Sequence, residues 1–276
     1  MIYKRVEINI DYQKLHCIHD EYQPYVDCYI HSQSPEIHRG KKRTAMIVCP
    51  GGAYYFKSDR EAEPIALRYL SYGMNCFVLQ YSVSPSRYPC AMLELAETVR
   101  LIREHAEEWD IDPHKVILCG FSAGGHLCAS LGTKWNSSIV RDYFGDTFLQ
   151  CKPDGMILAY PVISMGEYTH AESRSNLLDG TAYEAKEVSL ELCVDQDTVP
   201  AFIWSSYEDT AVPCENALLL ALAYRKQKIP FELHVYEKGE HGIALGDAET
   251  LDQPYQIQPD NANWLKMSVN WAERLG

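Results

Sequence analysis

The chain has 276 residues, of which 46% are hydrophobic and 23% charged, and its formal net charge is −13. This composition is typical of a globular protein with a buried core, and the acidic balance excludes the basic surface that nucleic-acid binding requires. The N-terminus has no signal-peptide core, because Glu7 and Asp11 interrupt its short apolar stretch. No run approaches the roughly 20 apolar residues that span a bilayer. We therefore expect a cytoplasmic protein with neither a nucleic-acid nor a membrane partner.

Residues before about 40 alternate in polarity and include turn residues such as Pro24, which predicts antiparallel strands at the edge of a sheet. Several side chains in this part could bind a metal, but their spacing fits no zinc pattern: His16, Cys17, His19, Cys28 and His31. We expect exposed strand residues there, and no metal site.

Six short apolar runs follow, and most are continuous rather than alternating, as in strands buried on both faces of a parallel sheet: 44–49, 76–80, 115–119, 156–160, 201–204 and 231–236. Helical periodicity separates them. One apolar stripe comprises Leu95, Val99, Ile102, Ala106 and Trp109, and another comprises Trp264, Met267, Trp271 and Leu275. The alternation of strands and helices predicts a doubly wound, mostly parallel α/β sheet, with residues 1–276 forming a single domain.

The apolar pattern weakens between Pro161 and Pro200, where Gly166, Gly180 and scattered charges occur. A connection this long inside a compact domain is usually functional, so we expect a small cap or lid insertion at about 162–199. The ten cysteines include no C-x-x-C pair, and several lie within predicted strands, which indicates reduced core thiols.

The strand at 115–119 is followed by Gly120-Phe-Ser-Ala-Gly-Gly-His-Leu127, which contains the pattern G-x-S-x-G around Ser122. A nucleophilic serine must project from a sharp strand-to-helix turn, and flanking glycines remove the Cβ atoms that would clash there. The following helix directs its N-terminal amides at the reaction centre. A glycine-rich turn capping a helix is the alternative, but the strand before and the helix after favour a nucleophile.

A serine needs a base to accept its proton, and in this arrangement the acid and then the histidine follow the serine along the chain. Asp209 comes just after the strand that ends at Trp204, and His241 lies on a glycine-flanked loop after the last strand. The other histidines lie in helices, in strands or before the acid. We therefore predict a triad of Ser122, Asp209 and His241, with the neighbouring Glu208 directed toward solvent or the pocket rim.

Acyl transfer also requires amide donors for the oxyanion. One comes from Ala123, directly after the nucleophile. Others are expected from Pro50-Gly-Gly-Ala-Tyr54, where small residues follow the first buried strand and let backbone N–H groups turn inward. A plain tight turn is the alternative interpretation of this loop.

Together these motifs resemble the α/β-hydrolase acetyl esterases of the hormone-sensitive-lipase-like and acetyl xylan esterase-like group. The resemblance covers about residues 46 to 245 and includes CPGGAYYFKSDREAEPIA, YSVSPSRYP, EEWDIDPHKV, GFSAGGHL, YPVIS, NLLDG, DTAVP and GEHGIAL. It implies the α/β-hydrolase fold, the same triad, and Gly52, Ala53 and Ala123 as oxyanion donors. It also implies a serine esterase acting on short acyl esters, with acetyl groups on sugars as a candidate substrate class, and with no cofactor and no metal.

Three departures from the resembling family stand out. The oxyanion loop has Pro50 where the family often has histidine, and Ala53 in place of a third glycine. After Trp204 the chain has Ser205 and Ser206 where the family tends to place a histidine in the loop.

Two alternatives remain open at this stage: an amide or formamide hydrolase with the same triad, and a ligand-binding homologue that has lost activity. We expect Tyr54 and Tyr55, which follow the oxyanion loop, to shape the substrate pocket together with the cap. The sequence does not specify the acyl group or the alcohol.

Overall fold

The structure is a computed structural model that describes residues 1–15, 17–34, 36–37 and 40–275. Its centre is an eight-stranded sheet with the order β1-β2-β4-β3-β5-β6-β7-β8. The strands are β1 (Ile2–Glu7), β2 (Tyr25–Ile30), β3 (Arg43–Cys49), β4 (Asn75–Gln80), β5 (Ile111–Phe121), β6 (Gly155–Ala159), β7 (Ala201–Ser206) and β8 (Phe231–Tyr236).

The sheet is parallel from β4 to β8 and antiparallel at its N-terminal edge, where β1 pairs with β2 and β2 with β4. The predicted mixed architecture is therefore confirmed. Because the parallel strands share one direction, their carboxyl ends meet at one edge of the sheet, where the loops after β3, β5, β7 and β8 gather.

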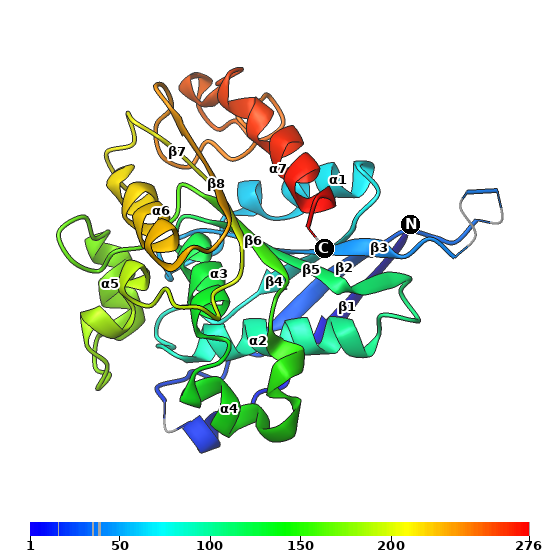
Figure 1. The fold of residues 1–276 in the computed structure, drawn as a ribbon, viewed down its shortest axis with the longest axis horizontal. Helices are drawn as coiled ribbons and strands as arrows, with labels where there is room; N and C mark the ends of the chain where they lie inside the picture. Colours follow the sequence, from blue (N-terminus) through cyan, green and yellow to red (C-terminus); the bar gives the residue numbers. More distant parts are fainter. Residues whose placement is uncertain (16, 35, 38–39, 276) are drawn as a thin grey trace.

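Helices cover both faces of the sheet (Figure 1). They are α1 (Glu63–Ser71), α2 (Cys90–Glu104), α3 (Ala123–Lys134), α4 (Ser138–Phe144), α5 (Ala171–Leu178), α6 (Glu215–Gln227) and α7 (Trp264–Glu273). Short 3-10 helices are η1 (Tyr12–Leu15), η2 (Asp59–Glu61), η3 (Gly145–Cys151), η4 (Ala185–Glu187), η5 (Leu190–Leu192), η6 (Pro254–Gln256) and η7 (Asn261–Asn263).

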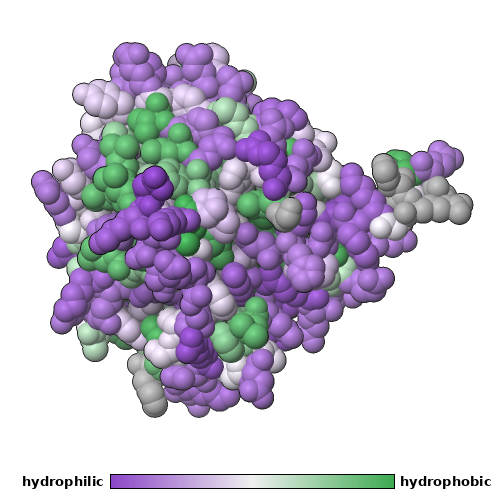
Figure 2. Space-filling view, in the orientation of Figure 1, coloured by the Kyte–Doolittle hydropathy of each residue, from purple (hydrophilic) through white to green (hydrophobic). Residues whose placement is uncertain are grey.

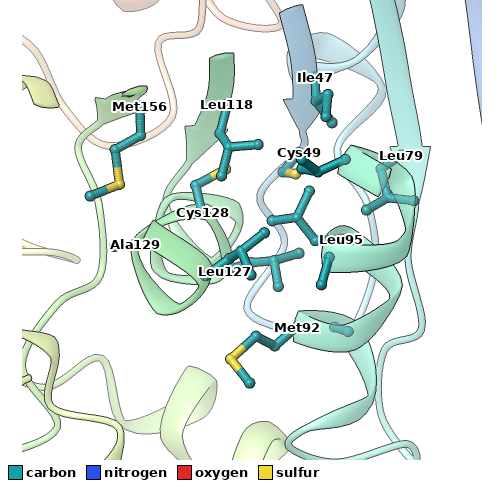
Figure 3. Close-up of a cluster of buried hydrophobic side chains, with 14 of the residues drawn as sticks. Ile47, Cys49, Leu79, Met92, Leu95, Leu118, Leu127, Cys128, Ala129 and Met156 are labelled. Carbon is teal, nitrogen blue, oxygen red and sulfur yellow. The ribbon is translucent and has the colours of Figure 1, made fainter. Parts of the chain in front are cut away.

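The core has two parts, one on each face of the sheet. Residues of α2, α3 and α6 pack on one face, and residues of α1 and α7 pack on the other. In β3, Ile47 and Cys49 belong to the first part, whereas Met46 and Val48 belong to the second. Figure 3 shows the first part, where Cys128 of α3 lies near Leu118 of β5 and Leu127 of α3 lies near Leu95 of α2. Burial on both faces explains why the strand sequences are continuously apolar.

The apolar stripes extend past the helices that they predicted. The helix α2 ends at Glu104, yet Ala106 and Trp109 of the same stripe are buried in the turns that follow. Leu275 likewise lies beyond the end of α7. The apolar periodicity indicates which side chains face the core, but not where the helix ends. A turn that follows the helix along the sheet can bury residues at the same spacing.

The expectation for the N-terminal histidines and cysteines was partly wrong. Cys28 is in strand β2 but fully buried, and Cys17 and His19 lie outside the strands. His16 lies outside the described residues. Within the described parts of the chain, no group of three or more His, Cys, Asp or Glu residues could hold a metal ion.

The segment 162–199 connects β6 to β7 and contains α5, η4 and η5. Its apolar side chains join the core on the α3 face, including Ile163, Leu177, Val188 and Leu190. Its function as a cap stays a prediction.

The surface in the view of Figure 2 is hydrophilic over most of its area, with hydrophobic residues gathered around α6. Leu218 and Leu222 are exposed on that helix. Across the described ranges, no helix is long and apolar enough to cross a membrane.

Candidate active site

Ser122 occupies the turn between β5 and α3, in a backbone conformation that an L-residue rarely adopts (φ 52°, ψ −116°). Its amide donates to the Ala159 carbonyl at 3.0 Å, and its carbonyl accepts from Val162 at 3.1 Å. Gly124 lets the start of α3 approach the end of β3, since a Cβ there would lie 2.1 Å from the Cys49 carbonyl oxygen. These contacts hold the strained turn that the G-x-S-x-G pattern predicted.

The structure brings the three predicted triad residues together. The Ser122 hydroxyl lies 2.8 Å from Nε2 of His241, and Nδ1 of His241 lies 2.6 Å from Oδ2 of Asp209. With Nδ1–H donating to the carboxylate, Nε2 is the acceptor for the serine proton. The ring of Tyr160 packs edge-on against the imidazole at a centroid distance of 5.1 Å. The order of bonds is the one that general-base activation of a serine requires.

The Asp209 carboxylate is held from both sides. Oδ1 of Asp209 accepts from the amides of Ala211 and Val212, at 3.1 and 2.8 Å, and the residue is only 3% exposed. Glu208 instead pairs with Lys238 at 2.7 Å, and this hydrogen bond lowers the pKa of the Glu208 carboxyl. The structure thus separates the two neighbouring carboxylates as the sequence predicted.

Hydrogen bonds within the loop after β3 fix the orientation of two predicted oxyanion donors, the amides of Gly52 and Ala53. These bonds are made to the carbonyls of the same two peptide groups. The Gly51 carbonyl accepts from Ser58 at 3.0 Å, and the Gly52 carbonyl accepts from Tyr55 and Phe56 at 2.8 and 3.0 Å. In a trans peptide the N–H points opposite to the C=O. The amides of Gly52 and Ala53 therefore point away from these donors. Among the described residues, neither amide is bonded to a protein acceptor.

The two tyrosines predicted to shape the pocket have different surroundings. Tyr55 is 63% exposed, whereas Tyr54 is buried and its hydroxyl lies 2.9 Å from Nδ1 of His126. Nε2 of His126 lies 2.8 Å from the Val188 carbonyl, so Nε2–H donates there and Tyr54 donates to Nδ1. Burial lowers the pKa of His126 to about 4. Tyr54 is thus an anchor between the oxyanion loop and the 162–199 segment, and its contact with substrate stays a prediction.

Serines 205 and 206 lie within β7 rather than in the loop after it, and both are buried. The Ser206 hydroxyl accepts from the Asn261 side chain at 3.1 Å. Both serines therefore belong to the sheet, directly before the loop that carries Asp209.

Two polar residues of the 162–199 segment, Asn176 and His170, were not assigned a function from the sequence. The Asn176 amide donates to the Ala53 carbonyl at 2.9 Å, which ties α5 to the oxyanion loop. His170 precedes α5, and its Nδ1 accepts from Ser173. Burial lowers the pKa of His170, and the nearby His241 lowers it further. Asn176 is the first residue of the NLLDG motif, so the resemblance marked the segment without indicating what it does.

The parallel sheet, its helical crossovers and the serine turn define the α/β-hydrolase fold, as predicted. The chain belongs to the BD-FAE family, whose family model matches residues 32–224.

Among curated relatives, the chain is 38% identical over 235 residues to endo-1,4-beta-xylanase B of Butyrivibrio fibrisolvens, covering 82% of this chain and 35% of that protein. It is 30% identical over 230 residues to an acetylxylan esterase of Xylanibacter ruminicola, covering 80% of this chain and 45% of that protein. The chain thus spans less than half the length of these relatives.

Solved structures match along almost the whole chain. An acetyl ester-xyloside bifunctional hydrolase from Caldicellulosiruptor lactoaceticus has a TM-score of 0.81 and 31% identity, with 98% of this chain and 95% of that one covered. The carboxylesterase Cest-2923 from Lactobacillus plantarum has a TM-score of 0.86 and 26% identity, with 99% and 97% covered.

Proposed function

We propose that this chain is a serine carboxylesterase that hydrolyses short-chain acyl esters, with acetyl esters of sugars as its substrate class. The observation that carries the proposal is the continuous series of hydrogen bonds from Asp209 through His241 to Ser122, at 2.6 and 2.8 Å. A ligand-binding homologue without activity would have no need of this complete series.

In this mechanism, His241 accepts the Ser122 proton as the hydroxyl oxygen attacks the ester carbonyl. Asp209 holds the imidazole in one tautomer and stabilises its cation. The amides of Gly52, Ala53 and Ala123 stabilise the oxyanion. The imidazolium then protonates the alcohol as its bond to the acyl carbon breaks. Water attacks the acyl-enzyme with His241 again as the base, and the bond to Ser122 breaks as the serine oxygen recovers the proton and the acid is released.

The substrate class rests on the similarity to proteins whose names specify acetyl and xylan chemistry. The segment 162–199 acts in this proposal as a cap that shapes the substrate pocket, because its residue Asn176 bonds to the Ala53 carbonyl of the oxyanion loop.

The cysteines support a reducing, cytoplasmic location for this activity. All ten are free thiols, and eight of them are buried. Secreted proteins more commonly carry disulfides.

The test is a substrate panel with purified wild-type and Ser122→Ala protein. Wild type should hydrolyse p-nitrophenyl acetate and acetylated xylo-oligosaccharides, and Ser122→Ala should lower the rate by about 10⁴-fold or more. Ser130→Ala removes another buried serine hydroxyl of α3 and should retain the activity. Faster turnover of N-formyl anilines than of any acetyl ester would favour the formamide alternative instead.

A further inference from the structure

A buried carboxylate outside the triad, that of Glu61, connects the oxyanion loop through Tyr160 to the loop that carries His241. Glu61, the last residue of η2, is only 3% exposed. Its Oε2 accepts from the Gly51 amide at 2.8 Å, and its Oε1 accepts from the Tyr160 hydroxyl at 2.7 Å. Burying a carboxylate is costly, and here both oxygens are satisfied by partners from two different loops.

On the oxyanion side, Gly51 lies between this carboxylate and the nucleophile. A Cβ on Gly51 would lie 2.6 Å from Oε2 of Glu61, 2.9 Å from the Phe121 carbonyl oxygen and 3.0 Å from Cβ of Ser122. The backbone of the loop is thus held at van der Waals distance from the serine turn. The next amide along the chain is that of Gly52, a predicted oxyanion donor, so any displacement of Gly51 displaces that donor as well.

On the histidine side, the link runs through Tyr160. Its hydroxyl donates to Glu61 and accepts from the Ala244 amide at 3.0 Å, while its ring packs against His241. Arg60, the residue before Glu61, donates to the Gly242 carbonyl at 2.9 Å, directly after the base. The short helix η2 therefore contacts both flanks of the site, and Glu61 joins them through one side chain.

We propose that Glu61 is a positioning residue, which keeps the oxyanion amides and the catalytic imidazole in register with each other around Ser122. The proposal rests on the esterase function proposed above. Misplacing reacting groups by about 1 Å can lower a rate by about 10²-fold, even when the ground-state contacts of the substrate survive. Loss of Glu61 should therefore lower kcat much more than it raises KM.

The chain offers a matched control in Glu94, a second fully buried carboxylate. Glu94 also accepts from one tyrosine hydroxyl, that of Tyr12 at 2.8 Å, and from one backbone amide, that of Ser82 at 2.7 Å. In both Glu61→Gln and Glu94→Gln, an NH₂ group replaces one carboxylate oxygen. It then faces a backbone amide or a tyrosine hydroxyl that is itself a hydrogen-bond donor. Their structural costs should be similar, while only the first variant disturbs the loops of the site.

The experiment compares both variants with wild type on p-nitrophenyl acetate, with the folded fraction measured by circular dichroism. We expect kcat of Glu61→Gln to fall about 10- to 100-fold with KM within about threefold, and Glu94→Gln to retain kcat within about threefold. Binding of a trifluoromethyl ketone, which forms an oxyanion on the serine, should weaken in parallel with kcat/KM. Equal kcat values for the two folded variants, or unchanged ketone affinity in Glu61→Gln, would overturn the proposal.

Tyr160→Phe keeps the ring against His241 and removes only the hydroxyl, so it tests the same link if Glu61→Gln does not fold. We expect its kcat to fall about tenfold, and wild-type turnover by this variant would contradict the proposed connection. Inactive wild-type protein would instead refute the esterase function itself, which separates the two failures.

Discussion

The buried imidazole of His126 makes the stability of the fold depend on pH in a calculable way. It is fully buried, it bonds to Tyr54 and to the Val188 carbonyl, and burial lowers its pKa from 6.5 to about 4. Because the folded-state pKa is depressed, the unfolded chain binds a proton between these two values while the folded chain does not. Acidification through this window therefore favours unfolding.

The magnitude follows from linkage. Between about pH 8 and pH 5, this one site should lower the free energy of unfolding by about 2 kcal/mol. Other groups with shifted pKa values also make the stability depend on pH. We therefore compare wild type with His126→Gln, which lacks only this one titrating group. Glutamine can donate to the Val188 carbonyl and accept from Tyr54, yet it does not titrate.

The assay is urea unfolding of both proteins at the two pH values. The stability difference between wild type and His126→Gln should move by about 2 kcal/mol in favour of the variant at the lower pH. A difference that stays constant within about 0.5 kcal/mol would refute the assignment of a depressed folded-state pKa to His126.

Three further predictions concern catalysis. Asp209→Asn should slow turnover by about 10⁴-fold, whereas Glu208→Gln, which removes an exposed partner of Lys238, should cost less than about tenfold; the reverse ranking on one acetyl ester would transfer the acid function to Glu208. Asn176→Ala releases the Ala53 carbonyl and should lower kcat/KM by about tenfold, and an unchanged value would remove α5 from the support of the oxyanion loop. In a p-nitrophenyl ester series, activity should peak at short acyl chains, and a peak at about ten carbons would contradict the acetyl esterase proposal.

The sequence predicted the sheet well because its strands are buried on both faces. The run at 231–236 coincides with β8, and the antiparallel edge was read from its alternation. Boundaries were less certain where burial continues past an element. For example, β5 begins at Ile111 rather than at Lys115, because Ile111 pairs with Arg43 of β3 ahead of a register shift that precedes the pair of Val116 and Ala45.

The sequence proposed Ser122, Asp209 and His241 as a triad because each follows a strand in a fixed order, and the structure brings the three side chains within hydrogen-bond distance. The residues that support them could not be predicted in this way. Asn176 contacts Ala53, 123 residues away, and Glu61 contacts Tyr160, 99 residues away, and neither side chain has a local pattern that indicates its partner. Tyr54 was expected at the pocket because of its position after the oxyanion loop. Only the fold brings its hydroxyl to His126, which lies 72 residues away.

The most direct test of the account is identification of the acyl-enzyme. Wild-type protein mixed rapidly with p-nitrophenyl acetate and quenched in acid should carry one acetyl group on the peptide that contains Ser122, and p-nitrophenol should be released in a burst. The Ser122→Ala variant should show neither. An acetyl group on another residue, or a burst that persists in Ser122→Ala, would contradict the assignment of Ser122 as the nucleophile.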